Sequence, residues 1–162
     1  MPVLVCLELF GILNVDMLFK RPLKLDDGEI RLQFAGKHVD PKKNGWGTSF
    51  IYDIVVSDKI VGRCDLRIGS GTTIDYAGHI GYSVYLPYRG HHYAAKACLL
   101  LFKQAKHMGM DEILITCNTD NIASYRTCEL CGCTYVGTKP VPLDHELYLQ
   151  GDREKALFIK HL

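Results

Sequence analysis

The segment Val84-Tyr-Leu-Pro-Tyr-Arg-Gly-His-His-Tyr-Ala94 decides the fold. A strand-like stretch ends here, since Pro87 lacks the N–H that a further ladder position needs, and a helical pattern follows directly. The first N–H groups of such a helix have no partner within it, and their partial positive charge favours an anion. Gly90 and Ala94 leave the backbone accessible, and Arg89 adds a cation. The segment therefore predicts a site for a di- or polyphosphate.

Downstream of this segment the apolar pattern has the period of a helix. Apolar side chains recur at three- and four-residue intervals from Ala94 to Met108, and Gly109 suits a helix end. Three further elements are predicted: a strand at 112–117, a helix at 121–130 and a last strand at 156–161. A helix between two strands requires a crossover to a parallel strand, so a mixed sheet is expected.

Upstream of it the pattern is that of strands. Residues 29–34 alternate strictly, which predicts that Ile30, Leu32 and Phe34 share the buried face. Two β-rich runs and a short polar turn follow, and they predict a hairpin of 50–56 with 60–68. A loop is then expected at 69–78 and a strand at 79–86. The whole chain, 1–162, is predicted to be one α/β domain with helices packed on the sheet.

Composition narrows the class of protein. Of the 162 residues, 48% are hydrophobic and 23% charged, and the formal net charge is +1, so nothing favours nucleic acid or a polybasic membrane contact. The apolar stretch Met1–Phe19 is interrupted by Glu8, Asn14 and Asp16, which indicates a buried helix or strand rather than a membrane span or a leader. Seven cysteines, an odd number, indicate reduced thiols in a cytoplasmic protein.

Two motifs at a suitable separation give a resemblance. Arg89, His92 and Ala94 resemble the acetyl-CoA loop of the GNAT superfamily of N-acetyltransferases, in which an Arg or Gln is followed by small residues. Residues 81–84 resemble the fourth strand of that family. The second family motif matches Asn121, Ser124, Glu129 and Gly132. His92 replaces the usual glycine, and its imidazole either contacts a phosphate or points to solvent.

The resemblance implies a mostly antiparallel sheet with a central, splayed parallel pair, flanked by helices. It also implies an acetyltransferase that uses acetyl-CoA as cosubstrate and a small-molecule or peptide amine as acceptor, by direct attack in a ternary complex. Homodimers are common in this family. The residues that it assigns to the cosubstrate are Val84, Tyr85, Leu86, Arg89, Gly90, His91, His92, Tyr93, Ala94, Asn121 and Ser124.

Amine acetylation needs an oxyanion donor, an acid for the thiolate and a base for the ammonium. The predicted donor is the backbone N–H of Val84 or Tyr85. Candidate acids share one helical stripe, namely Ser124, Tyr125 and Cys128. Candidate bases are His79 and Asp65, with a water chain as the alternative. A polar and aromatic group, His145, Glu146 and Tyr148, either lines the acceptor pocket or forms an ordinary loop.

Two other functions are compatible with the sequence. One is a CoA-binding sensor without catalysis, because Cys128 stands where many family members have a tyrosine. The other is a zinc or redox protein built on Cys128, Cys131 and Cys133. Zinc usually takes four ligands, and no second Cys-x-x-Cys pair is present, so no metal is expected.

Overall fold

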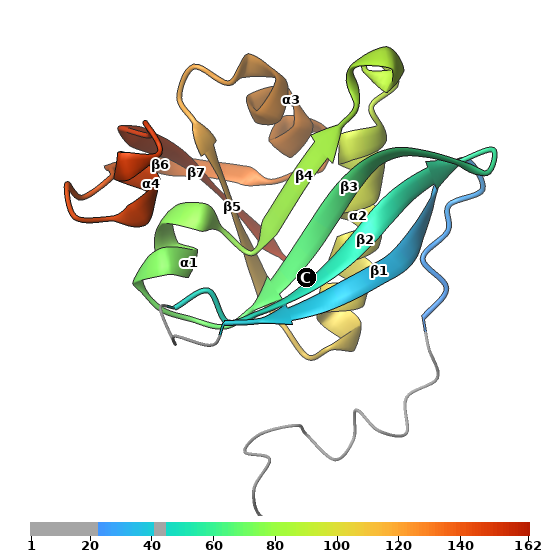
Figure 1. The fold of residues 1–162 in the computed structure, drawn as a ribbon, viewed down its shortest axis with the longest axis horizontal. Coiled ribbons are helices and arrows are strands. Elements are labelled where there is room, and N and C mark those ends of the chain that lie inside the picture. The colour runs from blue at the N-terminus through green and yellow to red at the C-terminus, as the bar shows by residue number, and fades with distance from the viewer. Residues whose placement is uncertain (1–22, 41–44) are drawn as a thin grey trace, which may run out of the picture.

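The structure is a computed structural model that describes residues 23–40 and 45–162 (Figure 1). The predicted N-terminal helix or strand, Met1–Phe19, lies outside these residues. Within them the elements are β1 (Arg31–Val39), β2 (Thr48–Val56), β3 (Lys59–Ile68), α1 (Thr72–Ala77), β4 (Ile80–Val84), the 3-10 turn η2 (Leu86–Tyr88), α2 (Tyr93–His107), β5 (Glu112–Asn118), α3 (Ile122–Leu130), β6 (Thr134–Pro140), α4 (Glu146–Leu149) and β7 (Glu154–His161).

The described strands form two antiparallel sheets. One has the order β1-β2-β3-β4 and the other β5-β7-β6. The predicted hairpin of β2 and β3 is confirmed, and it turns at Ser57 and Asp58, whose φ angles are +45° and +63°. Two successive positive φ angles are typical of the tight turn that matches the twist of a two-stranded ribbon.

The predicted central splay lies between β4 and β5. The two strands run in the same direction on either side of a widening gap (Figure 1). The backbone N–H of His79 donates to the Leu114 carbonyl at 2.7 Å, while β4 pairs along its length only with β3. At this end the chains approach so closely that a Cβ on Gly78 would lie 2.9 Å from the Leu114 oxygen. The mixed α/β fold with a crossover helix is therefore as predicted. The expected mixed sheet, however, is divided among the described strands into two antiparallel sheets, because β4 and β5 run in the same direction and are joined only at this end.

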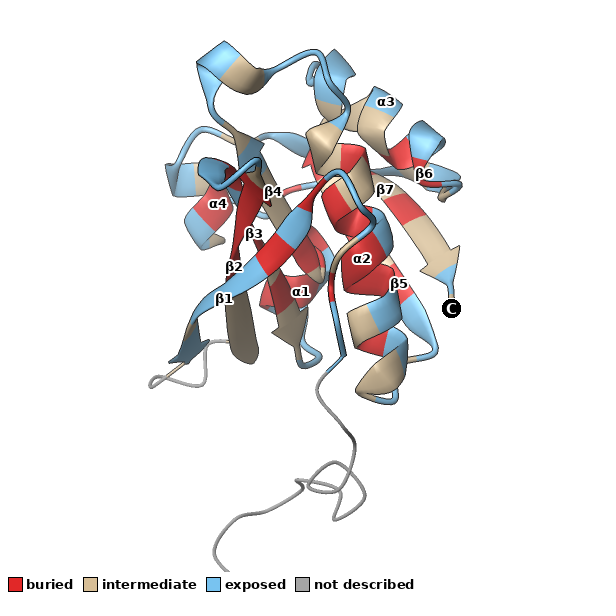
Figure 2. Cartoon of the chain, turned by 90° about the vertical axis from the view of Figure 1, so that its right-hand side faces the viewer, coloured by how far each residue is buried: buried red, intermediate tan, exposed pale blue. Residues whose placement is uncertain are grey.

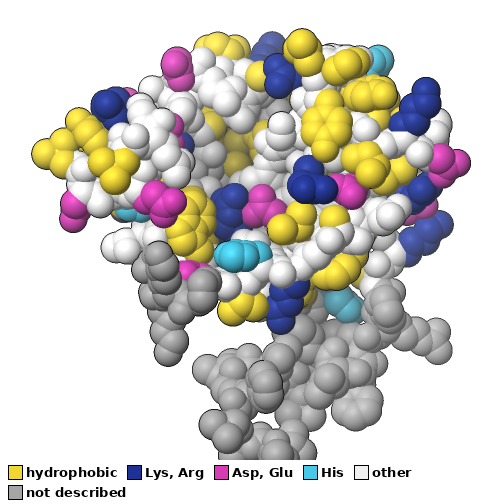
Figure 3. Space-filling view, viewed as in Figure 1, with side chains coloured by type: hydrophobic (Ala, Val, Ile, Leu, Met, Phe, Trp, Pro, Cys, Tyr) yellow, Lys and Arg dark blue, Asp and Glu magenta, His cyan; other side chains and the backbone are white. Residues whose placement is uncertain are grey.

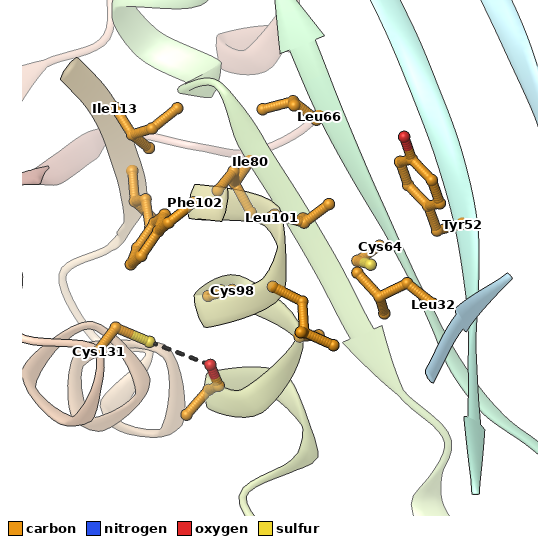
Figure 4. Close-up of a cluster of buried hydrophobic side chains, with 14 of the residues drawn as sticks. Leu32, Tyr52, Cys64, Leu66, Ile80, Cys98, Leu101, Phe102, Ile113 and Cys131 are labelled. Atoms are coloured by element: carbon orange, nitrogen blue, oxygen red, sulfur yellow. Dashed lines mark hydrogen bonds between the residues drawn. The ribbon is translucent and has the colours of Figure 1, made fainter. Parts of the chain in front are cut away.

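Helix α2 fills the space behind the sheets. Its buried face turns toward the strands and its other face is exposed (Figure 2). Cys98 and Leu101 on α2 meet Leu66 on β3 and Ile80 on β4 in the core (Figure 4). The exposure of these four side chains is at most 2%, so the three- and four-residue apolar period of α2 is fully used in packing.

Three local predictions are corrected by the structure. Phe34 was expected on the buried face, but the residue is 58% exposed. It lies at a bulge of the edge strand β1, and its ring contacts the Tyr52 ring edge to face. The predicted loop 69–78 contains the short helix α1. The region of His145 contains α4, with His145 as its N-cap.

The cysteines of the C-terminal half are part of the core. Cys128 and Cys131 are buried, and the Cys131 thiol donates to the Ala95 carbonyl at 3.5 Å (Figure 4). Such thiols behave as small apolar side chains. Within the described residues, no three Cys, His, Asp or Glu side chains are grouped as a metal would require. None of the helices described there is long and apolar enough to cross a membrane.

Candidate active site

The predicted phosphate loop borders a cavity of about 530 Å³, called here the helix-start cavity. It lies between the N-terminus of α2, the end of β4 and the first turns of α3. The chain reaches it through η2 and two left-handed residues, Gly90 with φ +87° and His92 with φ +59°. His92 is the N-cap of α2, so its backbone holds the shape for which a glycine is the usual choice. Its exposed side chain also borders this cavity.

Eight of the residues predicted to bind the cosubstrate line the helix-start cavity: Val84, Arg89, Gly90, His92, Tyr93, Ala94, Asn121 and Ser124. Three do not line it, namely Tyr85, Leu86 and His91. Leu86 is 75% exposed on η2, and His91 stacks on Tyr93 with 5.2 Å between ring centroids. Arg89 points its Nε back to the Val84 carbonyl at 3.0 Å, which fixes the turn and leaves its Nη groups for a ligand.

The strand register decides between the two predicted oxyanion donors. The Tyr85 N–H donates to the Val61 carbonyl at 2.9 Å, so it is already used, and Val84 is the remaining alternative. N–H groups alternate in direction along a strand. That of Val84 therefore points away from β3, toward the gap between β4 and β5.

A pair of hydroxyl groups stands at the inner end of the helix-start cavity. The Tyr82 and Ser124 side-chain oxygens are 3.1 Å apart and joined by a hydrogen bond. The first comes from β4 and the second from α3, where the Asn121 side chain caps the helix by accepting from the Ser124 N–H at 3.1 Å. Burial raises the pKa of Tyr82, so its phenol stays protonated and is a permanent hydrogen-bond donor.

Neither of the other two candidate acids lines a cavity of the site. Tyr125 packs its ring on Phe158 at a centroid distance of 4.7 Å, on the β6–β7 side of α3. Cys128 is fully buried behind Tyr82 and lines none of the three cavities found at the site. Burial also raises the pKa of the Cys128 thiol. Of the predicted stripe, only Ser124 reaches the cavity.

A second cavity, the sheet-face cavity of about 720 Å³, lies on the face of the four-stranded sheet opposite α2. Charged side chains of both signs meet on this face (Figure 3). Asp65 is part of its lining and binds Arg67, whose Nε is 2.9 Å from Oδ2. Burial raises the pKa of the Asp65 carboxyl, while Arg67 opposes the shift. Gly81 on β4 leaves room for this pair, because a Cβ there would lie 2.5 Å from the Asp65 Oδ1.

A third cavity shares lining residues with the first two. This strand-gap cavity, of about 220 Å³, opens between β4 and the α4 region, where the surface is hollowed (Figure 3). It shares Ser124 with the helix-start cavity and Arg67 with the sheet-face cavity, while Tyr82 lines all three. We call these three cavities together the passage; Tyr82 lines each of them, and Ser124 lines two.

The α4 segment supports one wall of this passage. Of the predicted group, the Glu146 carboxylate accepts a hydrogen bond from the Trp46 indole at 3.3 Å, and the Trp46 ring lines two of the cavities. His145 accepts at Nδ1 from the Leu147 N–H at 3.1 Å. Leu147, rather than His145, Glu146 or Tyr148, faces the strand-gap cavity.

His79 acts as a link between the two sheets. Its Nδ1 accepts from the Leu114 N–H at 2.9 Å, and its side chain also bonds to the Gly69 backbone. It lines none of the three cavities. Burial lowers the pKa of His79, so the neutral imidazole that these bonds require is retained near pH 7.

This link predicts a pH dependence of stability. Because the pKa of His79 is below 6.5 in the folded protein, the unfolded chain binds more protons, and the free energy of unfolding falls as pH drops below about 6.5. His79→Gln keeps an acceptor and cannot titrate, so its unfolding in urea should show a smaller loss between pH 7.5 and pH 5. His79→Ala should cost about 1–3 kcal/mol at pH 7.5 through the unpaired backbone groups. An equal pH dependence in the wild type and His79→Gln would contradict the assignment.

Four site residues escaped sequence analysis: Tyr82, Trp46, Arg67 and Lys155. Tyr82 lies within the stretch 81–84 that resembles the family strand, but strand alternation alone does not show which neighbour its ring meets. The other three come from β-strands and loops far apart in sequence, and no local pattern marks them.

Comparison with known proteins identifies the family. The family described as acetyltransferase (GNAT) domain matches residues 14–134. No curated protein matches in sequence.

Solved structures share the fold at low identity. The microcin C7 self-immunity acetyltransferase MccE, solved with acetyl-CoA and AMP, has 21% identity and a TM-score of 0.55 over 70% of this chain and 61% of its own. An acetyltransferase from Salmonella typhimurium that modifies the N-terminal serine of ribosomal protein L7/L12 has 20% identity and a TM-score of 0.56, over 70% of this chain and 64% of its own.

The ribosomal-protein-S5-alanine acetyltransferase of Vibrio fischeri has 21% identity and a TM-score of 0.56, over 70% of this chain and 61% of its own. The chain thus spans about three fifths of the length of these proteins. The family match covers most of the chain. The end of β4, the start of α2 and the helix α3 follow one another in the order of the two sequence motifs. The chain belongs to the GNAT family of acetyltransferase domains.

Proposed function

We propose that the protein transfers an acetyl group from acetyl-CoA to an amine by direct attack in a ternary complex. The observation that carries this proposal is the passage, in which Tyr82 borders a cavity at the start of α2 and two cavities on the other side. A donor and an acceptor can therefore meet at Tyr82 and Ser124 from opposite sides.

The helix-start cavity suits the donor. The diphosphate of CoA would lie against the N–H groups of residues 92–95, where the partial charge of the α2 N-terminus favours an anion. Arg89 lies beside it with its Nη groups available. A structural relative has been solved with acetyl-CoA, which supports the same ligand here.

The residues at the gap can carry the chemistry. Asp65, which lines the sheet-face cavity together with Tyr82, accepts the ammonium proton, and the neutral nitrogen attacks the thioester carbonyl carbon. The Val84 N–H stabilises the oxyanion. When the intermediate collapses, the C–S bond breaks and the C–N bond remains. After the attack the nitrogen carries a second surplus proton, and this proton passes to the sulfur through the Ser124 hydroxyl, which Tyr82 holds in place.

Binding and turnover can be tested separately on the wild-type protein. Acetyl-CoA should raise the melting temperature, because it binds the native state, whereas a zinc chelator should leave it unchanged. Free CoA thiol should then appear when a panel of amines is added. Stabilisation without turnover on any amine would favour a CoA sensor, and absence of stabilisation would overturn the proposal.

A further inference from the structure

The strand-gap cavity contains a buried cation that acetyl transfer does not use. Lys155 on β7 lines this cavity, and the residue is 8% exposed. Its amino group lies 2.7 Å from Asn118 Oδ1 and 2.6 Å from Asp152 Oδ2. The Asn118 amide in turn donates to Asp152 at 2.8 Å. This closed triad fixes the position of a charge that would otherwise be costly to bury.

Lys155 retains one donor for a ligand. An ammonium group has three N–H bonds, and two acceptors are recorded for this one among the described residues. The remaining N–H is the group that a molecule in the cavity can use. Asp152 keeps its charge because its bonds to Lys155 and Asn118 outweigh the effect of burial and lower its pKa.

A second cation lines the same cavity. Arg67 uses Nη1 for the carbonyls of Ala77 and Gly78, at 2.9 and 3.1 Å. Its Nε and one Nη2 hydrogen bind Asp65, at 2.9 and 3.3 Å. One Nη2 hydrogen is left of the five that a guanidinium offers. The Arg67 guanidinium is thus held in place by its hydrogen bonds, and one of its N–H groups is left for a ligand.

The lining of the strand-gap cavity has one sign of charge. Its described members include Arg67 and Lys155 but no Asp or Glu, because the partner carboxylates lie outside the lining. Tyr82 and Ser124, at which transfer takes place, line the same cavity. At about 220 Å³ it has the volume of roughly seven waters, so the group that enters it is small.

We propose that the acceptor is a small amine that also carries a carboxylate, an amino acid in the broad sense. Its carboxylate binds between Lys155 and Arg67 in the strand-gap cavity, and its amine lies at Tyr82 and Ser124. This inference rests on the proposed acetyl transfer and specifies its acceptor. A carboxylate matches the one donor that each cation retains, because its two oxygens can accept from both.

The test compares matched amines that differ only in the anion. Glycine, β-alanine and 4-aminobutyrate are each assayed against the corresponding amide, with release of CoA thiol as the readout. At least one acid should exceed its amide about tenfold in kcat/KM, as expected for a hydrogen bond to a charged group. Lys155→Met should bring that ratio close to one by raising KM for the acid. An amino acid and its amide differ in the basicity of their amines. Comparing the acid-to-amide ratio of the wild type with that of Lys155→Met cancels this difference.

Two further variants keep the test decisive. Lys155→Met leaves Asp152 without its cation, so the double variant with Asp152→Asn replaces it if the single one does not fold. Lys160→Met is the matched control on the same strand, since the Lys160 amino group binds the Gly132 carbonyl at 3.2 Å. It should retain the acid preference.

The outcomes separate this inference from the acetyl transfer itself. If acids and amides react equally well in the wild type, the acceptor assignment is overturned and acetyl transfer stands. If no amine reacts, the proposed acetyl transfer is overturned, and binding of the acids then tests the carboxylate site in the strand-gap cavity. In the presence of CoA the acids should raise the melting temperature of the wild type and not of Lys155→Met, and no shift in either would overturn the carboxylate site.

Discussion

Acetyl-CoA is expected to lose about a hundredfold or more in affinity when Ala94 is replaced by Glu. Ala94 lies in the first turn of α2 and lines the helix-start cavity. A carboxylate there would meet the diphosphate at close range, and two like charges about 4 Å apart at an effective dielectric constant of about 20 repel by about 4 kcal/mol. About 2.7 kcal/mol corresponds to a hundredfold change in Kd. Isothermal titration with acetyl-CoA measures the effect.

The fold should survive this substitution, because a carboxylate near a helix N-terminus is itself favourable by about 0.3–1 kcal/mol. Ala94→Gln has the same size without the charge and separates steric from electrostatic exclusion. Leu99→Glu is the control on the same helix, since Leu99 is 44% exposed and lies outside the cavity. If Ala94→Glu binds acetyl-CoA as well as Leu99→Glu does, the cosubstrate does not occupy this cavity.

Loss of the hydroxyl pair should reduce the rate without loss of binding. Ser124→Ala removes the proposed proton donor, and Tyr82→Phe removes the phenol that lies 3.1 Å from it. A positioned proton donor contributes about 10²–10⁴-fold, so kcat should fall by about a hundredfold or more in Ser124→Ala. The Kd for acetyl-CoA should stay within about threefold, equal to about 0.65 kcal/mol. Steady-state kinetics and titration give the two values.

The double variant shows whether the two groups act together. If Tyr82 works through Ser124, the double variant should be little slower than Ser124→Ala, as is typical of residues that act as a unit. Tyr125→Phe is the control, because the Tyr125 ring packs on Phe158 away from the cavity. A kcat for Ser124→Ala equal to that of Tyr125→Phe would remove Ser124 from the mechanism.

The strand-to-helix loop could be predicted because its determinants are local. Pro87, Gly90 and the small residue Ala94 lie within eight consecutive residues. Pro87 ends the strand pairing, Gly90 permits a left-handed backbone, and Ala94 leaves the helix start accessible. The same holds for the Ser57–Asp58 hairpin. The helix α1 was missed because its short sequence, six residues after a glycine-rich stretch, carries too little periodicity to differ from a loop.

The residues that line the passage could be predicted only in part, because their contacts join distant segments. Tyr82 and Ser124 are 42 positions apart, and Lys155 and Asn118 are 37 apart. Which residue of an apolar stripe turns toward another element depends on packing that the stripe does not encode. For this reason Ser124, Tyr125 and Cys128 were equivalent in sequence and differ in the structure, where only Ser124 reaches the cavity.

The strands β4 and β5 diverge from the hydrogen bond between His79 and Leu114, as the two arms of an angle diverge from its vertex. The aperture grows with distance from it, and at about 3.3 Å per residue Tyr82 stands roughly 10 Å along its arm. The position of Tyr82 is therefore fixed by the number of residues between it and His79. A single residue inserted between His79 and Tyr82 would turn every later side chain of that arm to the opposite face and carry the phenol away from Ser124.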